Sequence, residues 1–458
     1  MPTKERYWTH PSVKALVEGS DRDPVAAISQ KAGDVSLTAM QQGWSGPPFD
    51  PFWLAEFLKV RAVPREDVGD ARTVPSGPGL TIEFNPNHPK ARVRYSIFHE
   101  LAHTLFPDCR ERIRNRLTHA AMKGDDWQLE MLCNLAAAEF AMPVGTLPSV
   151  SEQHLDIDRA LELREKYGVS VEAMLLRLAK LTDQQCSFFC ASRVGVDMAK
   201  PRYVVDYTKP SRAWSDATIR QGMDLPDDTI AAGCTAIGFT ARGQEEWGRL
   251  GKIRVECVGV RPYPNHTFPR VVGLLRPIRQ SASHLPSITY LKGDASEPRG
   301  SGTRLLIQVV NDAALTWGGG FSLVLRKKWP SLQQAFRSWA MEFRNLKLAN
   351  LHIVAVDETL SLISMVAQHG YGPSATPRIR YLALRDCLKK IGDIAAERGA
   401  TVHMPRIGCG LAGGSWDVVS ELITETISNR GVKVFVYDLP GTKPKGHPQA
   451  SLQFPLVS

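Results

Sequence analysis

The spacing of apolar residues divides the chain into a helical first part, a strand-rich middle and an alternating last part. In the first part, apolar residues recur with the three-to-four-residue spacing of amphipathic helices. Asp23 is suited to begin the first helix and Pro143 to end a later one. Alternation before Asn85 predicts a strand. The predicted helices are 24–32, 54–60, 92–106, 127–142 and two short stretches around Gly168.

After about residue 200 the pattern changes twice. Three alternating segments separated by Gly, Pro and Asn predict a small β-rich piece, at 202–208, 252–260 and 270–275. From about residue 287, compact apolar strands alternate with helical segments, which is typical of an α/β domain with a largely parallel sheet. The predicted strands are 288–295, 305–311, 351–357, 400–408 and 432–440, and the predicted helices are 377–399 and 415–431.

These patterns predict a multidomain protein of mixed α+β and α/β class, because 458 residues are too many for one hydrophobic core. The expected parts are a mostly helical domain at 1–195, a β-rich linker domain at 196–280 and an α/β domain at 281–458.

Composition adds little beyond this division. The net charge of +9 permits an acidic partner such as nucleic acid, and equally a basic solvated surface. The eight cysteines are scattered; only Cys186 and Cys190 are close, which favours buried reduced thiols over a zinc ribbon. The start has no apolar signal core, and no run of eighteen apolar residues occurs. We expect a cytoplasmic protein without membrane contact.

The strongest chemical motif is His99-Glu100-Leu101-Ala102-His103. On a helix, the two imidazoles project from one face and can ligate one Zn²⁺, while Glu100 can take a proton from metal-bound water. A catalytic zinc needs a third protein ligand. The helix at 127–142 offers Glu130, our choice, and Glu139, the runner-up. Asn134 or a backbone carbonyl could orient a ligating imidazole.

A second candidate site lies in the α/β domain. Two glycine-rich loops follow predicted strands, where backbone N–H groups can approach a diphosphate. Asp294 follows another strand and could accept a hydrogen bond from an adenine amino group. Ligands in such sheets bind beyond the carboxyl ends of the strands. The candidate residues are Asp294, Asn311, Asp312, Trp317, Gly318, Gly319, Gly320, Arg406, Ile407, Gly408, Cys409, Gly410 and Leu411.

The first motif has a family context. The runs YSIFHELAHTLFPD and ExxCNLAAAEFAMP, with PFDPFWLAEFLKV before and GVSVEAMLLRLAKL after, resemble the ImmA/IrrE family of metallo-endopeptidases over about residues 40–185. The resemblance implies that His99, His103 and Glu130 are zinc ligands and Glu100 the catalytic base. It further implies a substrate among transcriptional repressors or similar regulators, in stress or mobile-element responses such as phage defence.

The second site resembles a macrodomain, the ADP-ribose-binding module, over about residues 288–441. The runs that carry the resemblance are GDA, VVNDA…WGGGFSLVLRKKWP, MVAQHGYG, IRYLALRDCL and MPRIGCGLAGGSWD. The closest kinship is with the branch that removes ADP-ribose from glutamate or DNA. This resemblance implies that Asp294 contacts the adenine, Asn311 the distal ribose and the second glycine-rich loop the diphosphate.

The sequence departs from that branch at its catalytic positions. Arg326 stands where the branch has a lysine, and Lys327 is one position away. Ala412 stands where one relative has a carboxylate after the second loop. Since arginine is effectively never deprotonated, covalent lysine catalysis is not expected. What remains is a binder, or a hydrolase that acts through Asp312, His369 or a positioned water, including a phosphatase of ADP-ribose phosphate.

Three hypotheses follow. In the first, a zinc peptidase cleaves a repressor-like protein or a toxin-system partner, and its macrodomain binds or hydrolyses ADP-ribose. In the second, the macrodomain is the hydrolase or reader of an ADP-ribosylated target, and the zincin part docks a partner. In the third, the helix pair around Gly168 is a helix–turn–helix of a DNA-bound regulator. The first is preferred, and direct DNA binding is not expected.

Overall fold

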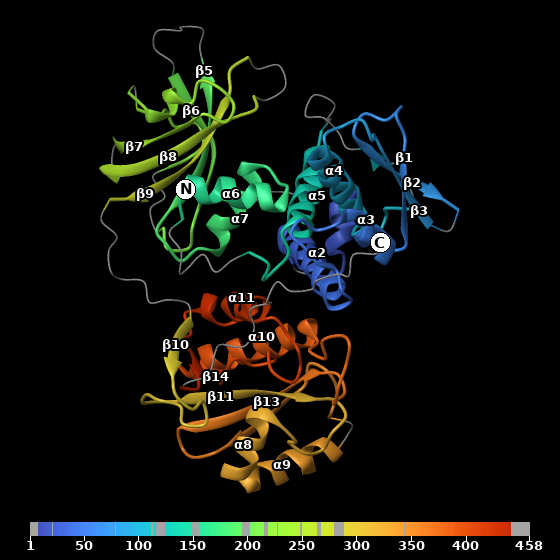
Figure 1. The fold of residues 1–458 in the computed structure, drawn as a ribbon, viewed down its shortest axis with the longest axis vertical. Helices are drawn as coiled ribbons and strands as arrows, with labels where there is room; N and C mark the ends of the chain where they lie inside the picture. The colour runs from blue at the N-terminus through green and yellow to red at the C-terminus, as the bar shows by residue number, and fades with distance from the viewer. Residues whose placement is uncertain are drawn as a thin grey trace, which may run out of the picture. The chain divides into compact units, whose positions relative to one another are not determined.

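A computed structural model gives the fold of most of the chain (Figure 1). It describes residues 8–20, 22–77, 79–110, 114–115, 124–147, 155–194, 202–214, 219–226, 228–247, 250–262, 267–278, 288–342 and 345–440. The chain forms two compact units. The N-terminal unit comprises residues 1–33, 44–142 and 149–285, and the C-terminal unit comprises residues 34–43, 143–148 and 286–458.

The first part of the chain is mostly helical, as predicted. Several helices begin at residues whose side chains accept a backbone N–H of the first turn: Asp50 does so for α3, Asp156 for α6 and Ser170 for α7. Gly168, in the left-handed region at φ 63°, ends α6. The helices are α1 Pro11–Val17, α2 Pro24–Gln41, α3 Pro51–Phe57, α4 Lys90–His103, α5 Asp126–Ala141, α6 Ile157–Tyr167 and α7 Val171–Leu181.

Two sheets belong to the N-terminal unit. The first has the order β1-β3-β2-β4 and combines one parallel pair with antiparallel pairs; its strands are β1 Val60–Pro64, β2 Ala71–Ser76, β3 Gly79–Phe84 and β4 Arg114–Asn115. The second is antiparallel, in the order β6-β5-β9-β8-β7, with strands β5 Ser187–Val194, β6 Arg202–Pro210, β7 Thr240–Glu246, β8 Lys252–Val260 and β9 Arg270–Pro277 and the short helix η1 Ile230–Gly233. This sheet is the β-rich middle piece.

The C-terminal unit is built on a six-stranded sheet in the order β10-β15-β14-β11-β13-β12. All neighbouring pairs are parallel except β12 and β13, which form an antiparallel hairpin. The strands are β10 Ile288–Lys292, β11 Arg304–Asn311, β12 Leu351–Ala355, β13 Leu360–Gln368, β14 Thr401–Pro405 and β15 Val434–Asp438.

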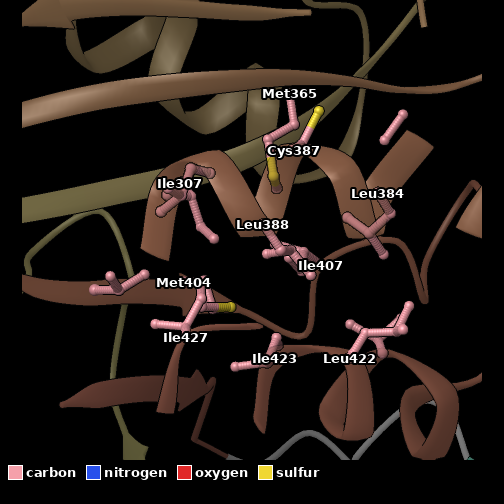
Figure 2. Packing of buried hydrophobic residues seen from close by; sticks show 14 of the residues in the cluster. Ile307, Met365, Leu384, Cys387, Leu388, Met404, Ile407, Leu422, Ile423 and Ile427 are labelled. Atoms are coloured by element: carbon pink, nitrogen blue, oxygen red, sulfur yellow. The ribbon is translucent and has the colours of Figure 1, made fainter. Parts of the chain in front are cut away.

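Helices cover both faces of this sheet (Figure 1). On one face, α10 and α11 pack over a large apolar cluster that includes Ile307, Met365 and Leu388, and Figure 2 shows these side chains interdigitating. On the other face, α8 and α9 cover a smaller cluster around Phe336 and Trp317. The helices are α8 Gly320–Lys328, α9 Pro330–Met341, α10 Tyr381–Glu397, α11 Trp416–Thr426 and the short η3 Ser428–Arg430.

The parallel sheet opens between the carboxyl ends of β11 and β14, where the second candidate site lies. The ladder between β11 and β14 has three residue pairs and ends where Leu306 faces His403, whereas β11 and β13 pair along the whole of β11. Beyond Leu306, the carboxyl ends of β11 and β14 therefore no longer bond to each other. Open sheets of this kind hold their ligands in such a crevice.

The predicted mixed fold class is confirmed, and several elements differ, among them the following two. Helix α2 runs on from residue 32 to Gln41, because apolar residues such as Leu37 and Ala39 continue the buried face. Strand β13, which lies between β11 and the edge strand β12, was missed, since it follows β12 without an intervening helix. The eight cysteines are buried and unbridged, as predicted. Among the described residues, no helix is long and apolar enough to cross a membrane.

One buried histidine makes the stability of the C-terminal unit pH-dependent. Burial, and to a smaller extent the charge of Arg304, lowers the pKa of His403 from 6.5 to about 4. Its ring nitrogens lie 2.8 Å from Thr401 Oγ1 and 3.0 Å from Tyr437 Oη. Because the unfolded chain binds a proton at this side chain near pH 6.5 and the folded chain only near pH 4, acid favours unfolding.

We therefore expect stability to fall between about pH 6.5 and about pH 4, by at most about 3 kcal/mol from this residue. Guanidinium unfolding of the wild type and of His403→Gln, which does not titrate, measures this contribution. The free energy of unfolding of the wild type minus that of the variant should decrease as the pH falls. A difference that stays constant with pH would contradict the assignment.

Candidate functional site

The motif on α4 lies in the interior of the N-terminal unit, against α5. His99, Glu100 and His103 are at most 1% exposed, and Glu130 of α5 is 3% exposed. His99 Nε2 lies 3.1 Å from one carboxylate oxygen of Glu130, and His103 Nε2 lies 3.8 Å from the other. The structure thus brings together the three side chains predicted as metal ligands.

The spacing of these three side chains fits a metal ion. Ligands bound tetrahedrally to one zinc at about 2.0–2.2 Å are themselves about 3.3 Å apart. The contact between His99 Nε2 and Glu130 lacks hydrogen-bond geometry, and that nitrogen has no hydrogen-bond partner among the described residues. Two imidazoles and a carboxylate are also a usual ligand set of catalytic zinc.

The other ring nitrogen of each histidine has a contact of its own. Asn134 Oδ1 lies 3.1 Å from His99 Nδ1 and also accepts a hydrogen bond of 2.8 Å from Tyr95 Oη. Cys133 Sγ lies 3.3 Å from His103 Nδ1. These contacts fix the orientation of each ring, so that its Nε2 points to Glu130. The hydrogen bond expected of Asn134 is present.

Glu100 is held from a different element. Thr73, a fully buried residue of β2, donates a hydrogen bond of 2.8 Å to Oε2 of Glu100. A carboxylate fixed in this way beside two imidazoles is suited to accept a proton from a bound water. Because Thr73 lies 27 positions earlier in the chain, no local pattern could have indicated it.

Two other side chains compete with Glu130 for the role of third ligand. Glu139, the runner-up in the sequence analysis, forms a buried ion pair of 3.2 Å with Arg177 of α7 instead. Cys133 belongs with His99 and His103 to a group whose ligand atoms lie within 4.8 Å. Its sulfur, however, faces Nδ1 of His103, while Glu130 faces Nε2 of both rings. We therefore retain Glu130.

The second site is a cavity of about 1340 Å³ in the C-terminal unit, at the carboxyl ends of β11 and β14. The first glycine-rich loop precedes α8 on one side, and the second follows β14 on the other. Predicted site residues that line the cavity are Asp294, Asn311, Trp317, Gly318, Gly319, Gly320, Arg406, Ile407, Gly408, Gly410 and Leu411.

The two loops come close together over this cavity. A Cβ atom placed on Gly319 would lie 2.8 Å from Cδ1 of Leu411, which is 77% exposed. In the second loop, Gly408 has a φ of 72°, a region that side chains disfavour, and its backbone lies against Ile379. Both loops can thus present backbone N–H groups to one extended anion.

Two predicted residues do not line the cavity. The carboxylate of Asp312 accepts hydrogen bonds from His369 Nδ1 at 2.7 Å and from the Gly370 N–H at 2.8 Å. Cys409 is buried, and burial raises the pKa of its thiol to about 12. Glycines flank Cys409, so a side chain directed into the core leaves the loop backbone facing the cavity.

Arg406 lines the cavity, but its guanidinium is already engaged. It forms two hydrogen bonds with Asp438, of 2.7 and 2.9 Å, and lies over the rings of Tyr290 and Trp416. Burial alone would lower the pKa of Arg406; the hydrogen bonds and charge of Asp438 outweigh burial and raise it. These contacts anchor the second glycine-rich loop to β15.

The side chains at and beside the position where the related branch carries its catalytic lysine lie outside the cavity. Arg326 and Lys327 are exposed on α8, and neither lines the cavity. One wall of the cavity was not predicted from the sequence. The segment from Tyr371 to Arg378 lines it, and its turns are supported by bonds from the Arg378 side chain to carbonyl oxygens of Gly372 and Pro373. Only the run of Gly, Pro and Ser could have indicated such a loop.

The N-terminal unit thus has a buried cluster of two histidines and a carboxylate, and the C-terminal unit has a glycine-lined cavity at the edge of an α/β sheet. Both parts of the chain have matches among known proteins. Residues 62–179 match the peptidase M78 family, described as the IrrE N-terminal-like domain. The match contains β2, α4 and α5, the elements that carry Thr73, the HExxH motif and Glu130.

The remaining matches concern the C-terminal part. A macrodomain protein from Streptomyces coelicolor is 37% identical; the match covers 33% of this chain and 98% of that protein, with a TM-score of 0.30. The mouse chromodomain-helicase-DNA-binding protein 1-like is 29% identical over 181 residues, 37% of this chain. The ADP-ribose 1″-phosphate phosphatase of Candida albicans is 22% identical over 145 residues, 30% of this chain and 92% of that enzyme.

The chain thus contains a segment that matches the IrrE N-terminal-like family model and a C-terminal part that is similar to macrodomain proteins. The chain spans about a fifth of the length of the mouse relative, so nothing outside the shared segment of that protein applies to it.

The choice between Glu130 and Glu139 is open to a direct test. Glu130→Gln should lose most of the bound zinc, because it removes the charged ligand that faces both Nε2 atoms. Glu139→Gln should keep the zinc and lose stability by up to about 3–5 kcal/mol, because it removes the carboxylate charge that faces the buried guanidinium of Arg177. Elemental analysis and thermal unfolding measure the two effects. Loss of zinc from Glu139→Gln alone would reverse the assignment.

Proposed function

We propose that the chain is a hydrolase, a zinc-dependent endopeptidase whose macrodomain binds ADP-ribose. The observation that carries the peptidase part is the convergence of His99, His103 and Glu130 beside Glu100. The match to the M78 family over the same elements supports it. The proposed substrate is a regulatory protein of the repressor type or a toxin-system partner, as the family resemblance implies.

In this proposal, each side chain near the motif has one task. His99, His103 and Glu130 would hold the zinc, which polarises the scissile carbonyl and lowers the pKa of water. Glu100 takes a proton from the attacking water and passes it to the departing amine. Thr73 holds Oε2 of Glu100, so the proton is accepted at Oε1. Asn134 fixes the ring of His99.

The second part of the proposal concerns the cavity of the C-terminal unit. A volume of about 1340 Å³ accommodates a dinucleotide-sized ligand, and two glycine-rich loops face it. Asp294 at one end would bind the adenine amino group, the loops the diphosphate, and Asn311 the distal ribose. The similar Candida albicans protein is a phosphatase of ADP-ribose 1″-phosphate, which supports a ligand of this class.

The alternative function is an ADP-ribosyl hydrolase or ADP-ribose reader in which the zincin part only docks a partner. The cavity supports both functions equally, so the zinc content of the protein is the measurement that distinguishes them. Protein purified without chelators should contain one zinc per chain if the first proposal holds. Absence of stoichiometric zinc would leave the alternative. We also propose that the three domains span residues 1–195, 196–280 and 281–458.

Glu100→Gln should abolish peptide cleavage and keep the zinc, because it removes the base and leaves all three ligands. The probe is a library of quenched-fluorescent peptides incubated with the full chain, and zinc is measured on the same samples. Glu66→Gln, an exposed substitution elsewhere in the N-terminal unit, is the control. Cleavage by Glu100→Gln at the wild-type rate would refute the peptidase mechanism.

Gly319→Glu should abolish ADP-ribose binding, because it places a carboxylate between the two glycine-rich loops. Gly319→Ala should retain most of the affinity, since the exposed Leu411 side chain can move away from one methyl group. Calorimetry of the full chain measures both. Wild-type affinity in Gly319→Glu, or no binding by the wild type, would refute the assigned cavity.

A further inference from the structure

Two cysteine side chains are in contact inside the β-rich middle piece, which neither proposed site uses. Cys234 immediately follows the short helix η1, and Cys257 lies on β8. Their sulfur atoms are 3.6 Å apart, and both residues are at most 1% exposed. The two sulfurs of a disulfide are about 2.05 Å apart. A movement of about 1.5 Å would therefore bring these two sulfurs to bonding distance.

Close backbone packing holds this contact in place. A Cβ atom on Gly259 of β8 would overlap the carbonyl oxygen of Ala236 and would lie 3.3 Å from that of Cys234. The Gly238 N–H donates to the Gly259 carbonyl, and the Gly259 N–H donates to the Phe239 carbonyl, each at 2.8 Å. The segment that carries Cys234 is thus seated directly on β8, because glycine leaves room for it there.

The start of η1 is anchored separately, on β7. The buried carboxylate of Glu245 accepts the Ile230 N–H at 2.5 Å and the Thr229 hydroxyl at 3.1 Å. Its other oxygen accepts the indole N–H of Trp247 at 2.6 Å. The short helix is therefore held to β7 at its first residue and to β8 just beyond its last.

The two thiols differ in reactivity. A hydrogen bond from Cys257 lowers the pKa of Cys234, whereas the same contact and burial raise the pKa of Cys257. By comparison, burial raises the pKa of Cys387 to about 12. Cys234 is also flanked by two exposed residues, Gly233 and Thr235. Because the thiolate is the nucleophile in thiol oxidation, we expect Cys234 to react first.

The two cysteines that are closest in the sequence are not placed to bond. Cys190 lies on β5, and Cys186 immediately precedes that strand. Four residues of extended chain separate their Cα atoms by about 13 Å. A disulfide needs Cα atoms less than about 7 Å apart. Cys234 and Cys257, which are 23 positions apart in the chain, are the better-placed pair.

We propose that Cys234 and Cys257 form a peroxide-reactive dithiol that closes to a disulfide and links η1 to β8. The Cys234 thiolate attacks one oxygen of hydrogen peroxide; a sulfur–oxygen bond forms, the oxygen–oxygen bond breaks, and the leaving hydroxide takes a proton to become water. The Cys257 sulfur then loses its proton and displaces the oxygen from Cys234 as a second water. Two electrons pass from the two thiols to the peroxide.

The experiment treats the full chain with hydrogen peroxide, blocks the remaining thiols with iodoacetamide and maps cross-linked peptides by mass spectrometry. The wild type should lose two of its eight free thiols, joined as Cys234–Cys257 within one chain, and dithiothreitol should restore them. The cross-link closes a loop that contains the edge strand β7. Oxidation should therefore raise the Tm by about 5–10 °C.

Two variants sharpen the test. Cys257→Ser keeps a hydrogen-bond donor beside Cys234 but cannot form the disulfide. Peroxide should leave a sulfenic acid at Cys234 in this variant, trapped by dimedone, and should not raise its Tm. Cys387→Ser, which replaces a buried thiol of the C-terminal unit, is the matched control and should form the cross-link as the wild type does.

The peptide map of the wild type decides the proposal even if a variant fails to fold. Eight free thiols after peroxide treatment would overturn it. A disulfide between other cysteines, or between two chains, would do so as well. A rise in Tm of Cys257→Ser equal to that of the wild type would show that the stabilisation has another source and would also count against the pair.

Discussion

A polar side chain that is taken out of water needs a partner, and in this chain the partners of buried polar groups come from different secondary-structure elements. Glu130 of α5 faces the histidines of α4, and Thr73 of β2 holds Glu100. In the C-terminal unit, Asp438 of β15 engages Arg406 after β14. Each such contact fixes one element against another. The same contacts that satisfy buried charge therefore also set the geometry of both sites.

The parts that could be predicted from the sequence are those that depend on local spacing. His99 and His103 share a helix face by their separation of four residues, and the alternation of strands and helices indicated the parallel sheet. The glycine-rich loops were recognisable because glycine and strand ends coincide in the sequence. Family resemblance then supplied the roles of residues that spacing alone cannot assign.

The parts that could not be predicted depend on tertiary pairing. Thr73 reaches Glu100 only because β2 lies against α4, and Arg406 bonds to Asp438 only because β14 and β15 are neighbours. Cys409 occurs within a loop whose backbone faces the cavity, yet its side chain is buried in the core. A motif specifies which backbone positions approach a ligand. It does not specify which side chains do.

The close approach of Gly319 and Leu411 has a kinetic consequence. These residues belong to two different loops, and both line the cavity. If the cavity binds an elongated ligand, as proposed, exchange of that ligand would require the Leu411 side chain to move away from Gly319. The residence time of such a ligand would then depend on the rotation of one solvent-exposed side chain. Substitutions at Leu411 would change association and dissociation rates together, with little effect on affinity.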